Sequence, residues 1–310
     1  MRCLVLGLDV GGTSSRALVA DLDGRVLGTG SAAGGNPQSH PVDEAVEQVL
    51  TAARSALGGL DPAEVRRTAV GLAGVSRFAD PAVADRFDEG WRRLGLGGPV
   101  EVVGDCDVAF AAGTPAASGT VLVAGTGSIA ARVEQHRVTG TAGGHGWLLG
   151  DEGSAFWLGR EAVRAALRAL DRAEAPGPLG RAVLDRWAPE PTDRRRALIT
   201  AANAGPPIRL AELAPLVTAA AEDDPVAAEI LRRAATLLAA AVADAGGDGP
   251  VVLAGGLLDG GPLDAAVRAE LAERGRTDPR AAGPGAAGAA WLAARELVDD
   301  PAALHARLLP

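Results

Sequence analysis

The sequence contains no lysine, because all 30 of its basic residues are arginine. A P-loop places a lysine on the nucleotide phosphates, and a protein kinase uses a lysine on its third strand. The absence of lysine therefore argues against both of these nucleotide-binding folds. Any phosphate bound by this chain must be held by backbone amides, hydroxyl groups or arginine side chains.

Cysteine and histidine are also scarce. Cys3 and Cys106 are the only cysteines; they form no CxxC pair and cannot build a zinc cluster or a disulfide framework. The histidines are too scattered to show a metal-ligand spacing: His40, His136, His145 and His305. This composition is typical of a protein of the reducing cytoplasm.

The chain also lacks a strongly basic region and a long hydrophobic run. Its net charge of −9 argues against a nucleic-acid partner. The most apolar predicted helix, near residues 234–243, is too short to span a bilayer, and the apolar run that ends at Asp9 is too short for a signal peptide. We expect a cytoplasmic globular protein without membrane or nucleic-acid partners.

Two parts of the chain, about 115 residues apart, begin with the same succession of strand, glycine–hydroxyl turn and strand. In the first part, the apolar patterning predicts strands at 3–8, 16–20, 25–29, 68–72 and 100–103, and helices at 42–57 and 81–94. In the second part, it predicts strands at 120–124, 129–133, 137–140 and 250–254, and helices at 154–170, 225–245 and 285–297.

This pattern predicts an α/β fold with two related domains that face a cleft. We expect an N-terminal domain over residues 1–108 and a C-terminal domain over residues 109–310, with a helical insertion at about 170–245. A helix near 290–310 is expected to pack back on the N-terminal domain.

The first turn between predicted strands reads Gly11-Gly12-Thr13-Ser14. Glycines let the backbone approach a ligand closely, so that N–H groups and neighbouring hydroxyls can reach phosphate oxygens. Asp9, at the end of the preceding strand, is placed to hold a hydrated magnesium ion. The alternative is a tight hairpin that binds no ligand.

A second turn of the same chemistry, Gly125-Thr126-Gly127-Ser128, follows the first strand of the other half. If the halves face each other, the two turns can close on one polyphosphate, although each alone can also be a structural turn. Gly255 and Gly256 follow a later strand and permit close approach of a flat ring such as adenosine. Their alternative role is the packing of a helix against a strand.

Asp105 follows an apolar strand where the chain crosses from one half to the other. A carboxylate there can accept the proton of a substrate hydroxyl as the oxygen attacks phosphorus. The alternative is an N-cap for the following helix, and Asp107 is an even better candidate for such capping.

A glycine-rich segment precedes another predicted helix and contains Gly144, His145, Gly146 and Trp147, followed by Asp151. A flexible backbone, a ring that can stack on a sugar and a carboxylate together suggest a sugar-hydroxyl site. Carboxylates at the start of a helix can also be simple partners of the helix dipole.

Together, these motifs resemble the actin-like sugar-kinase superfamily, and within it the BadF/BadG family that contains N-acetylglucosamine kinase. The likeness covers nearly the whole chain. It implies two ribonuclease H-like (actin-like) domains around a central nucleotide and sugar cleft, with ATP and Mg²⁺ as cofactors. The implied enzyme is a homodimeric kinase that phosphorylates the 6-hydroxyl of N-acetylglucosamine or glucosamine.

By position, the resemblance implies that Asp105 is the base that takes the proton from the sugar 6-hydroxyl. It also implies that Asn36 and Asp151 contact the sugar. Asp9 would assist magnesium. The two glycine–hydroxyl turns would hold phosphates, and Gly255-Gly256 would form the adenosine loop.

Two departures from the family pattern bear on the sugar. His145 stands where amino-sugar kinases of this type carry tryptophan, and Asp107 stands where they carry a small residue. Both positions would lie near the sugar 2-substituent. An acidic Asp107 there would favour a free amine over an acetamide.

The family also contains ATPases that activate radical dehydratases through an iron–sulfur cluster shared by two subunits. Cys106 follows Asp105, but no second suitable cysteine accompanies it. The alternative function is therefore an ATPase that acts as an activator or a nucleotide-dependent switch without a sugar substrate.

Overall fold

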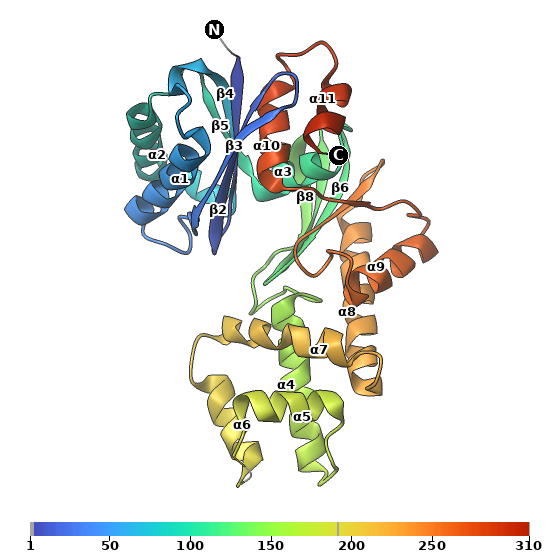
Figure 1. The fold of residues 1–310 in the computed structure, drawn as a ribbon. Helices are drawn as coiled ribbons and strands as arrows, with labels where there is room; N and C mark the ends of the chain where they lie inside the picture. Colours follow the sequence, from blue (N-terminus) through green and yellow to red (C-terminus); the bar gives the residue numbers. More distant parts are fainter. Residues whose placement is uncertain (1–2, 191, 310) are drawn as a thin grey trace. The chain divides into compact units, whose positions relative to one another are not determined.

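The structure is a computed structural model that describes residues 3–190 and 192–309, and the chain divides into two compact units (Figure 1). Unit 1 contains the residues up to 119, residues 133–139 and those from 282 onward, whereas unit 2 contains residues 120–132 and 140–281. Over the described residues, two five-stranded sheets are present, and the predicted α/β class is confirmed.

The first sheet has the strand order β3-β2-β1-β4-β5. Strands β1 to β3 form an antiparallel meander, whereas β4 and β5 run parallel to β1. The strand bounds are β1 Leu4–Val10, β2 Ser14–Asp21, β3 Val26–Ala33, β4 Val65–Leu72 and β5 Val100–Gly104.

Helices cover both faces of this sheet (Figure 1). One face is covered by α1 (Val42–Leu57) and α2 (Pro81–Leu94), which share a core with Leu4, Leu6 and Leu8 of β1. The other face is covered by α3 (Asp105–Gly113), α10 (Gly285–Ala294) and α11 (Pro301–Leu308), which share a core with Val5. The alternating side chains of β1 thus enter two different cores, because successive residues of a strand point to opposite faces. Short 3₁₀ helices occupy Pro62–Glu64 and Val75–Ala79.

The second sheet has the strand order β10-β9-β6-β7-β8, which matches the first sheet when it is read from β8. Strands β9 and β10 are parallel to β6 and β9, respectively. The strand bounds are β6 Gly119–Ala124, β7 Ser128–Glu134, β8 Arg137–Gly143, β9 Val251–Ala254 and β10 Arg280–Ala281.

The helices of unit 2 share one core with β6 and β9. The long helix α8 begins at Asp224-Pro225, where the Asp224 side chain accepts a hydrogen bond from the Val226 N–H. Figure 1 shows α4 to α7 gathered as one helical group within this unit. The helix bounds are α4 Ala155–Asp171, α5 Pro178–Trp187, α6 Arg194–Asn203, η3 Pro207–Leu213, α7 Ala214–Ala220, α8 Pro225–Ala245 and α9 Pro262–Glu273.

Some helices and strands are longer than predicted, and some observed elements were not predicted. Strand β3 continues to Ala33, although its inner positions Gly28 and Gly30 gave no apolar alternation. A Cβ atom at Gly28 would lie 2.1 Å from the Ala56 carbonyl oxygen, so small residues let α1 lie directly on this strand. Helix α9 was not predicted, whereas α11 lies in the range 290–310 where a helix is expected, and the domain boundary at residue 108 stays a prediction.

Of the helices in the described parts of the chain, not one combines the length and the apolar character needed to cross a membrane.

Gly7 in β1 offers a test of how closely α10 packs on the first sheet. A Cβ atom there would lie 2.2 Å from both the Ala286 oxygen and the Ala290 nitrogen, which are backbone atoms that cannot rotate away. We expect Gly7→Ala to destabilise the protein by about 3 kcal/mol, as overpacking does in a filled core. Urea denaturation measures this loss.

Gly59→Ala is the matched control, because a Cβ atom at Gly59 meets nothing within 4 Å. Equal midpoints for the two variants would contradict the packing described for α10.

Candidate functional site

The polar residues predicted in the first half gather at one edge of the unit 1 sheet. Strands β1, β4 and β5 are parallel, with Val10, Leu72 and Gly104 at the same level in the sheet. Asp9 and Asp105 therefore lie within one residue of this level, although they are 96 positions apart in the sequence. The carboxyl ends of parallel strands form the usual ligand-binding edge of an open α/β sheet.

Asp9 and Asp105 form an electrostatically coupled pair. Burial raises the pKa of the Asp105 carboxyl above its ordinary value, although the Cys106 N–H donates to its Oδ1 at 2.9 Å. Burial also raises the pKa of Asp9, and the negative charge of Asp105 raises it further, against the opposing effect of Arg16. A proton or a cation shared by the two carboxylates would relieve this repulsion.

The first glycine turn lies beside this carboxylate pair. The Gly11 N–H donates to the Ser14 oxygen at 2.9 Å and closes the turn, while Gly12 and Thr13 are exposed. The Gly35 N–H donates to the Gly11 oxygen at 3.2 Å, so the chain after β3 supports the turn.

Asn36 is half-buried and has a fixed orientation. Its Oδ1 accepts a hydrogen bond from the Gln38 N–H at 2.8 Å, and its backbone oxygen accepts from Ser39 and His40 at 3.1 Å. Since Oδ1 is used within the protein, the Nδ2 group is the part of the side chain that can donate to a ligand.

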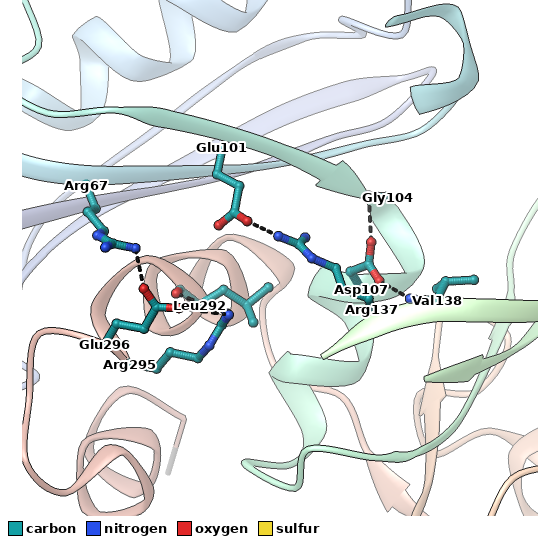
Figure 2. A network of polar contacts seen from close by, with 9 residues as sticks. All are labelled: Arg67, Glu101, Gly104, Asp107, Arg137, Val138, Leu292, Arg295 and Glu296. Carbon is teal, nitrogen blue, oxygen red and sulfur yellow. Dashed lines mark hydrogen bonds and ion pairs between the residues drawn. The ribbon is translucent and has the colours of Figure 1, made fainter. Parts of the chain in front are cut away.

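Asp107 is fixed by hydrogen bonds to the backbone, as Figure 2 shows. Its Oδ2 accepts from the Gly104 N–H at 2.8 Å, and its Oδ1 accepts from the Val138 N–H at 2.7 Å. The side chain is 6% exposed. These bonds support the capping alternative, and the expected contact of Asp107 with the sugar 2-substituent stays a prediction.

Figure 2 also draws two ion pairs that do not include Asp107. Arg137 pairs with Glu101, and Arg67 pairs with Glu296 at 2.6 Å. All four side chains are between 39% and 52% exposed, and pairs of this kind contribute little to stability.

In unit 2, the second glycine turn is bound to the start of α4. The N–H groups of Ala155 and Phe156 donate to the oxygens of Gly125 and Thr126, at 2.9 and 3.2 Å. The Ser128 hydroxyl donates to the Glu152 oxygen at 2.8 Å. The turn carbonyls satisfy the otherwise unpaired N–H groups of the helix, so turn and helix form one rigid part.

Asp151 lies directly against this turn. Its Oδ1 accepts a hydrogen bond from the Ser128 N–H at 3.2 Å, and its backbone has a left-handed φ of 54°. A Cβ atom at Gly127 would lie 2.8 Å from that Oδ1, so a side chain there would displace the Asp151 carboxylate. The turn and the predicted sugar residue therefore meet within unit 2.

A cavity of about 410 Å³ opens beside Asp151, entirely within unit 2. Its polar wall includes the predicted residues Ser128, His145 and Asp151. Helix α8 contributes a largely apolar wall that also contains Asp244. Sequence reasoning missed these α8 residues because their periodicity indicated an ordinary core: Leu237, Leu238, Ala240 and Ala241.

Trp147 lies on the same segment as His145 but has a different environment. Its ring contacts Phe156 with centroids 5.8 Å apart, and the residue is 38% exposed. Among the described residues, the lining of the cavity includes His145 but not Trp147, Gly144 or Gly146. Stacking of Trp147 on a sugar stays a prediction.

The predicted adenosine loop lies next to the second glycine turn. Gly255 has a left-handed φ of 97°, and a Cβ atom there would lie 2.2 Å from the Ala124 oxygen. Gly256 is exposed, and a Cβ atom there meets nothing within 4 Å. Because β6 and β9 are parallel neighbours, their carboxyl ends bring both loops to one edge.

Asp9 and Asp105 are the side chains at this edge that could help to hold a metal ion. Over residues 3–190 and 192–309, no three histidine, cysteine or acidic side chains form a cluster that could hold a metal. Cys106 is buried, and burial raises the pKa of its thiol well above the ordinary value, which disfavours the thiolate that an iron–sulfur cluster needs. Asp9 and Asp105 fit a hydrated Mg²⁺, which prefers one or two carboxylates together with water and phosphate.

Comparison with known proteins gives one family and several related kinases. A sequence profile of the BadF/BadG/BcrA/BcrD ATPase family matches residues 6–293. An N-acetylmuramic acid/N-acetylglucosamine kinase of Clostridium acetobutylicum is 30% identical over 170 residues, 54% of this chain and 55% of the relative. An N-acetyl-D-glucosamine kinase of Dictyostelium discoideum is 27% identical over 195 residues, 59% and 60% of the two chains. The chain thus spans little more than half the length of these curated relatives.

A crystal structure named as a candidate N-acetylglucosamine kinase, from Chromobacterium violaceum, matches nearly the whole fold. The match covers 94% of this chain and 99% of the other, with a TM-score of 0.76 and 29% identity. This likeness confirms the predicted two-domain, actin-like α/β fold class.

The coupled carboxylates lead to a prediction about stability. Because the pKa of Asp105 is raised in the folded state, its charged form destabilises the fold above that pKa. We expect Asp105→Asn to be more stable than wild type at pH 7 by about 1 kcal/mol, the usual scale of a single-site effect. The gain should shrink as pH falls through the raised pKa and vanish below about pH 4, where the unfolded carboxyl is also protonated.

Thermal denaturation between pH 4 and pH 8 measures this difference. Asp80→Asn is the control, because Asp80 is an exposed N-cap of α2 and asparagine also caps helices. A lower melting temperature for Asp105→Asn at pH 7 would contradict the assigned burial of the charge.

Proposed function

Because the chain belongs to the BadF/BadG/BcrA/BcrD ATPase family, we propose that it is an ATP-dependent kinase that phosphorylates the 6-hydroxyl of N-acetylglucosamine. The resemblance inferred from the motifs is confirmed at the level of the family. The observation that carries the proposal is the buried, coupled pair of Asp9 and Asp105 at the carboxyl edge of the unit 1 sheet. The names of the related kinases support the choice of sugar.

Asp105 is the proposed general base. Its carboxylate accepts the proton of the 6-hydroxyl as that oxygen forms a bond to the γ-phosphorus of ATP, and the bond from that phosphorus to the β–γ bridging oxygen breaks. A raised pKa suits this function, because proton transfer is most efficient when the pKa of the base lies near the working pH. Its position as the first residue of α3 fixes it to the end of β5.

The glycine turns are the proposed phosphate loops. Residues 11–14 and residues 125–128 would supply backbone N–H groups and hydroxyls to phosphate oxygens, in place of the lysine that the chain lacks. Asp9, with Asp105, would hold Mg²⁺ through its water shell. When bound, the ion neutralises charge on the phosphates. Gly255 and Gly256 are proposed to border the adenosine.

The cavity of unit 2 is the proposed sugar site, and the names of the related kinases support an N-acetylated sugar there. Asp151 is proposed to accept a hydrogen bond from a sugar hydroxyl, and Asn36 to donate one through Nδ2. The apolar residues that α8 contributes to the cavity suit the methyl of an acetamide, although Asp244 of the same helix also lines it. Asp107 is not proposed as a substrate residue, because backbone amides occupy both of its oxygens.

The homodimer and the cytoplasmic location stay predictions. Light scattering on the purified chain checks the first. The sugar-independent ATPase stays the alternative function and is judged by the experiment that follows.

Coupled ADP release tests the proposal with N-acetylglucosamine, glucosamine, N-acetylmannosamine, glucose or no sugar. We expect strong stimulation by N-acetylglucosamine and weaker stimulation by glucosamine. Asp105→Asn should lower kcat by about 100-fold or more, the contribution of a general base, while it retains nucleotide binding. ADP release that no sugar stimulates would favour the ATPase alternative, and near-normal turnover of Asp105→Asn would mean that another group is the base.

The contact between Gly127 and Asp151 gives a separate prediction about the sugar. Gly127→Ala would push the Asp151 carboxylate away from its present place, so the KM for the sugar should rise about tenfold, equivalent to one weakened hydrogen bond. Steady-state kinetics at saturating ATP measure the change.

Gly125→Ala is the matched variant in the same turn, because a Cβ atom there meets nothing within 4 Å. Its expected effect is confined to the KM for ATP. A rise in sugar KM that is equal in the two variants would contradict the assigned role of Asp151.

A further inference from the structure

The side chain of His40 reaches the first glycine turn from the segment that follows β3. Its Nε2 lies 2.8 Å from the carbonyl oxygen of Gly12. A carbonyl oxygen can only accept a hydrogen bond, so the ring nitrogen must be the donor. This contact joins residues 28 positions apart and had no signal in the sequence, where His40 was one of four scattered histidines.

The backbone on both sides of His40 in the sequence holds this residue in place. Its N–H donates to the Asn36 oxygen at 3.1 Å, within a turn that the Asn36 side chain closes through Gln38. Helix α1 begins two residues later, at Val42. The imidazole is therefore carried by a short segment anchored at one end by the turn of Asn36 and at the other by a helix.

The Gly12 carbonyl is enclosed by this segment. A Cβ atom at Gly34 would lie 2.1 Å from the Gly12 oxygen and 2.7 Å from the His40 Nε2. The Gly11 oxygen also accepts from this segment, through the Gly35 N–H at 3.2 Å. Two successive carbonyls of the turn thus point toward residues 34–40.

The orientation of these carbonyls determines the orientation of the amides. In a planar trans peptide, the N–H of the next residue points opposite to the carbonyl. The N–H groups of Gly12 and Thr13 are therefore directed away from residues 34–40, on the exposed side of the turn. Two adjacent N–H groups with a common direction are what an anion-binding turn needs.

We propose that His40 is a positioning residue for the nucleotide: its hydrogen bond to Gly12 directs the Thr13 N–H toward a phosphate oxygen of ATP. The inference rests on the proposed function, since it takes residues 11–14 as a phosphate loop. It adds a link between two proposed binding elements, because Asn36 and the Gly12 carbonyl are held by the same short segment.

Substitutions of His40 separate positioning from simple stabilisation. His40→Phe keeps a ring of similar size but removes the donor, whereas His40→Gln keeps an N–H donor. We expect His40→Phe to weaken binding of a non-hydrolysable ATP analogue about tenfold and to raise the KM for ATP similarly, as the loss of one ordered hydrogen bond would. His40→Gln should stay within about threefold of wild type, and the sugar KM at saturating ATP should change less than twofold in both.

His305→Phe is the matched control. His305 belongs to the same unit, and its Nε2 also lies 2.8 Å from a carbonyl oxygen, that of Ala111. A loss of stability without a change in nucleotide affinity is expected there. Gly34→Ala supplies an independent perturbation, because its Cβ atom displaces the same Gly12 carbonyl and should reproduce the His40→Phe phenotype.

Calorimetry with the ATP analogue and steady-state kinetics decide between the outcomes. Selective loss of nucleotide affinity in His40→Phe and Gly34→Ala, with recovery in His40→Gln, supports the inference. Unchanged affinity in His40→Phe, or equal loss in His305→Phe, overturns it. If His40→Phe does not fold, Gly34→Ala and His40→Gln still give the comparison: normal affinity in Gly34→Ala, or a tenfold loss in His40→Gln, overturns the inference.

The kinase proposal fails separately, if wild type binds the analogue but no sugar stimulates ADP release. In that case the binding measurements still judge His40.

Discussion

Parallel pairing of β1, β4 and β5 is the constraint on which the candidate chemistry depends. It sets Val10, Leu72 and Gly104 at one level, and so brings two carboxylates together from distant parts of the chain. Burial raises the pKa of both carboxyls, and the charge of Asp105 raises that of Asp9 further, more than the Cys106 N–H and Arg16 lower them. The sheet therefore holds an arrangement that is unfavourable by itself. Such an arrangement persists when packing elsewhere supplies the stability, here through α10 and α1, whose backbones lie directly on glycines of the sheet.

The features that could be predicted from the sequence are local ones. A continuous apolar run defines β1, a proline after Asp224 marks the start of α8, and glycine–hydroxyl turns mark the ends of β1 and β6. The prediction for β3 ended too early because Gly28 and Gly30 carry no side chain. The apolar pattern that indicates burial is therefore absent where α1 packs most closely on the strand.

The candidate site shows the same division. The glycine turns, Asp105 and Asp151 carry their chemistry in their immediate sequence. The α8 wall of the cavity does not, because a residue such as Leu238 has the same periodicity whether it faces a core or a ligand. His40 is the other case: its role depends on a carbonyl 28 residues away, and no spacing rule relates a side chain to a distant backbone oxygen.

Asp107 and Asp151 were both expected at the sugar, and their backbones help to separate them. Asp107 lies in the first turn of α3, where both of its oxygens accept backbone N–H groups, so its geometry is what a cap requires. Asp151 has a left-handed φ, which is unfavourable for a residue with a side chain, and one backbone N–H donates to its carboxylate. A strained residue persists where the surrounding structure determines it, and such residues cluster at ligand sites. The strain at Asp151 places a carboxylate against the second glycine turn and beside a cavity, which is the position that recognition of a sugar hydroxyl would need.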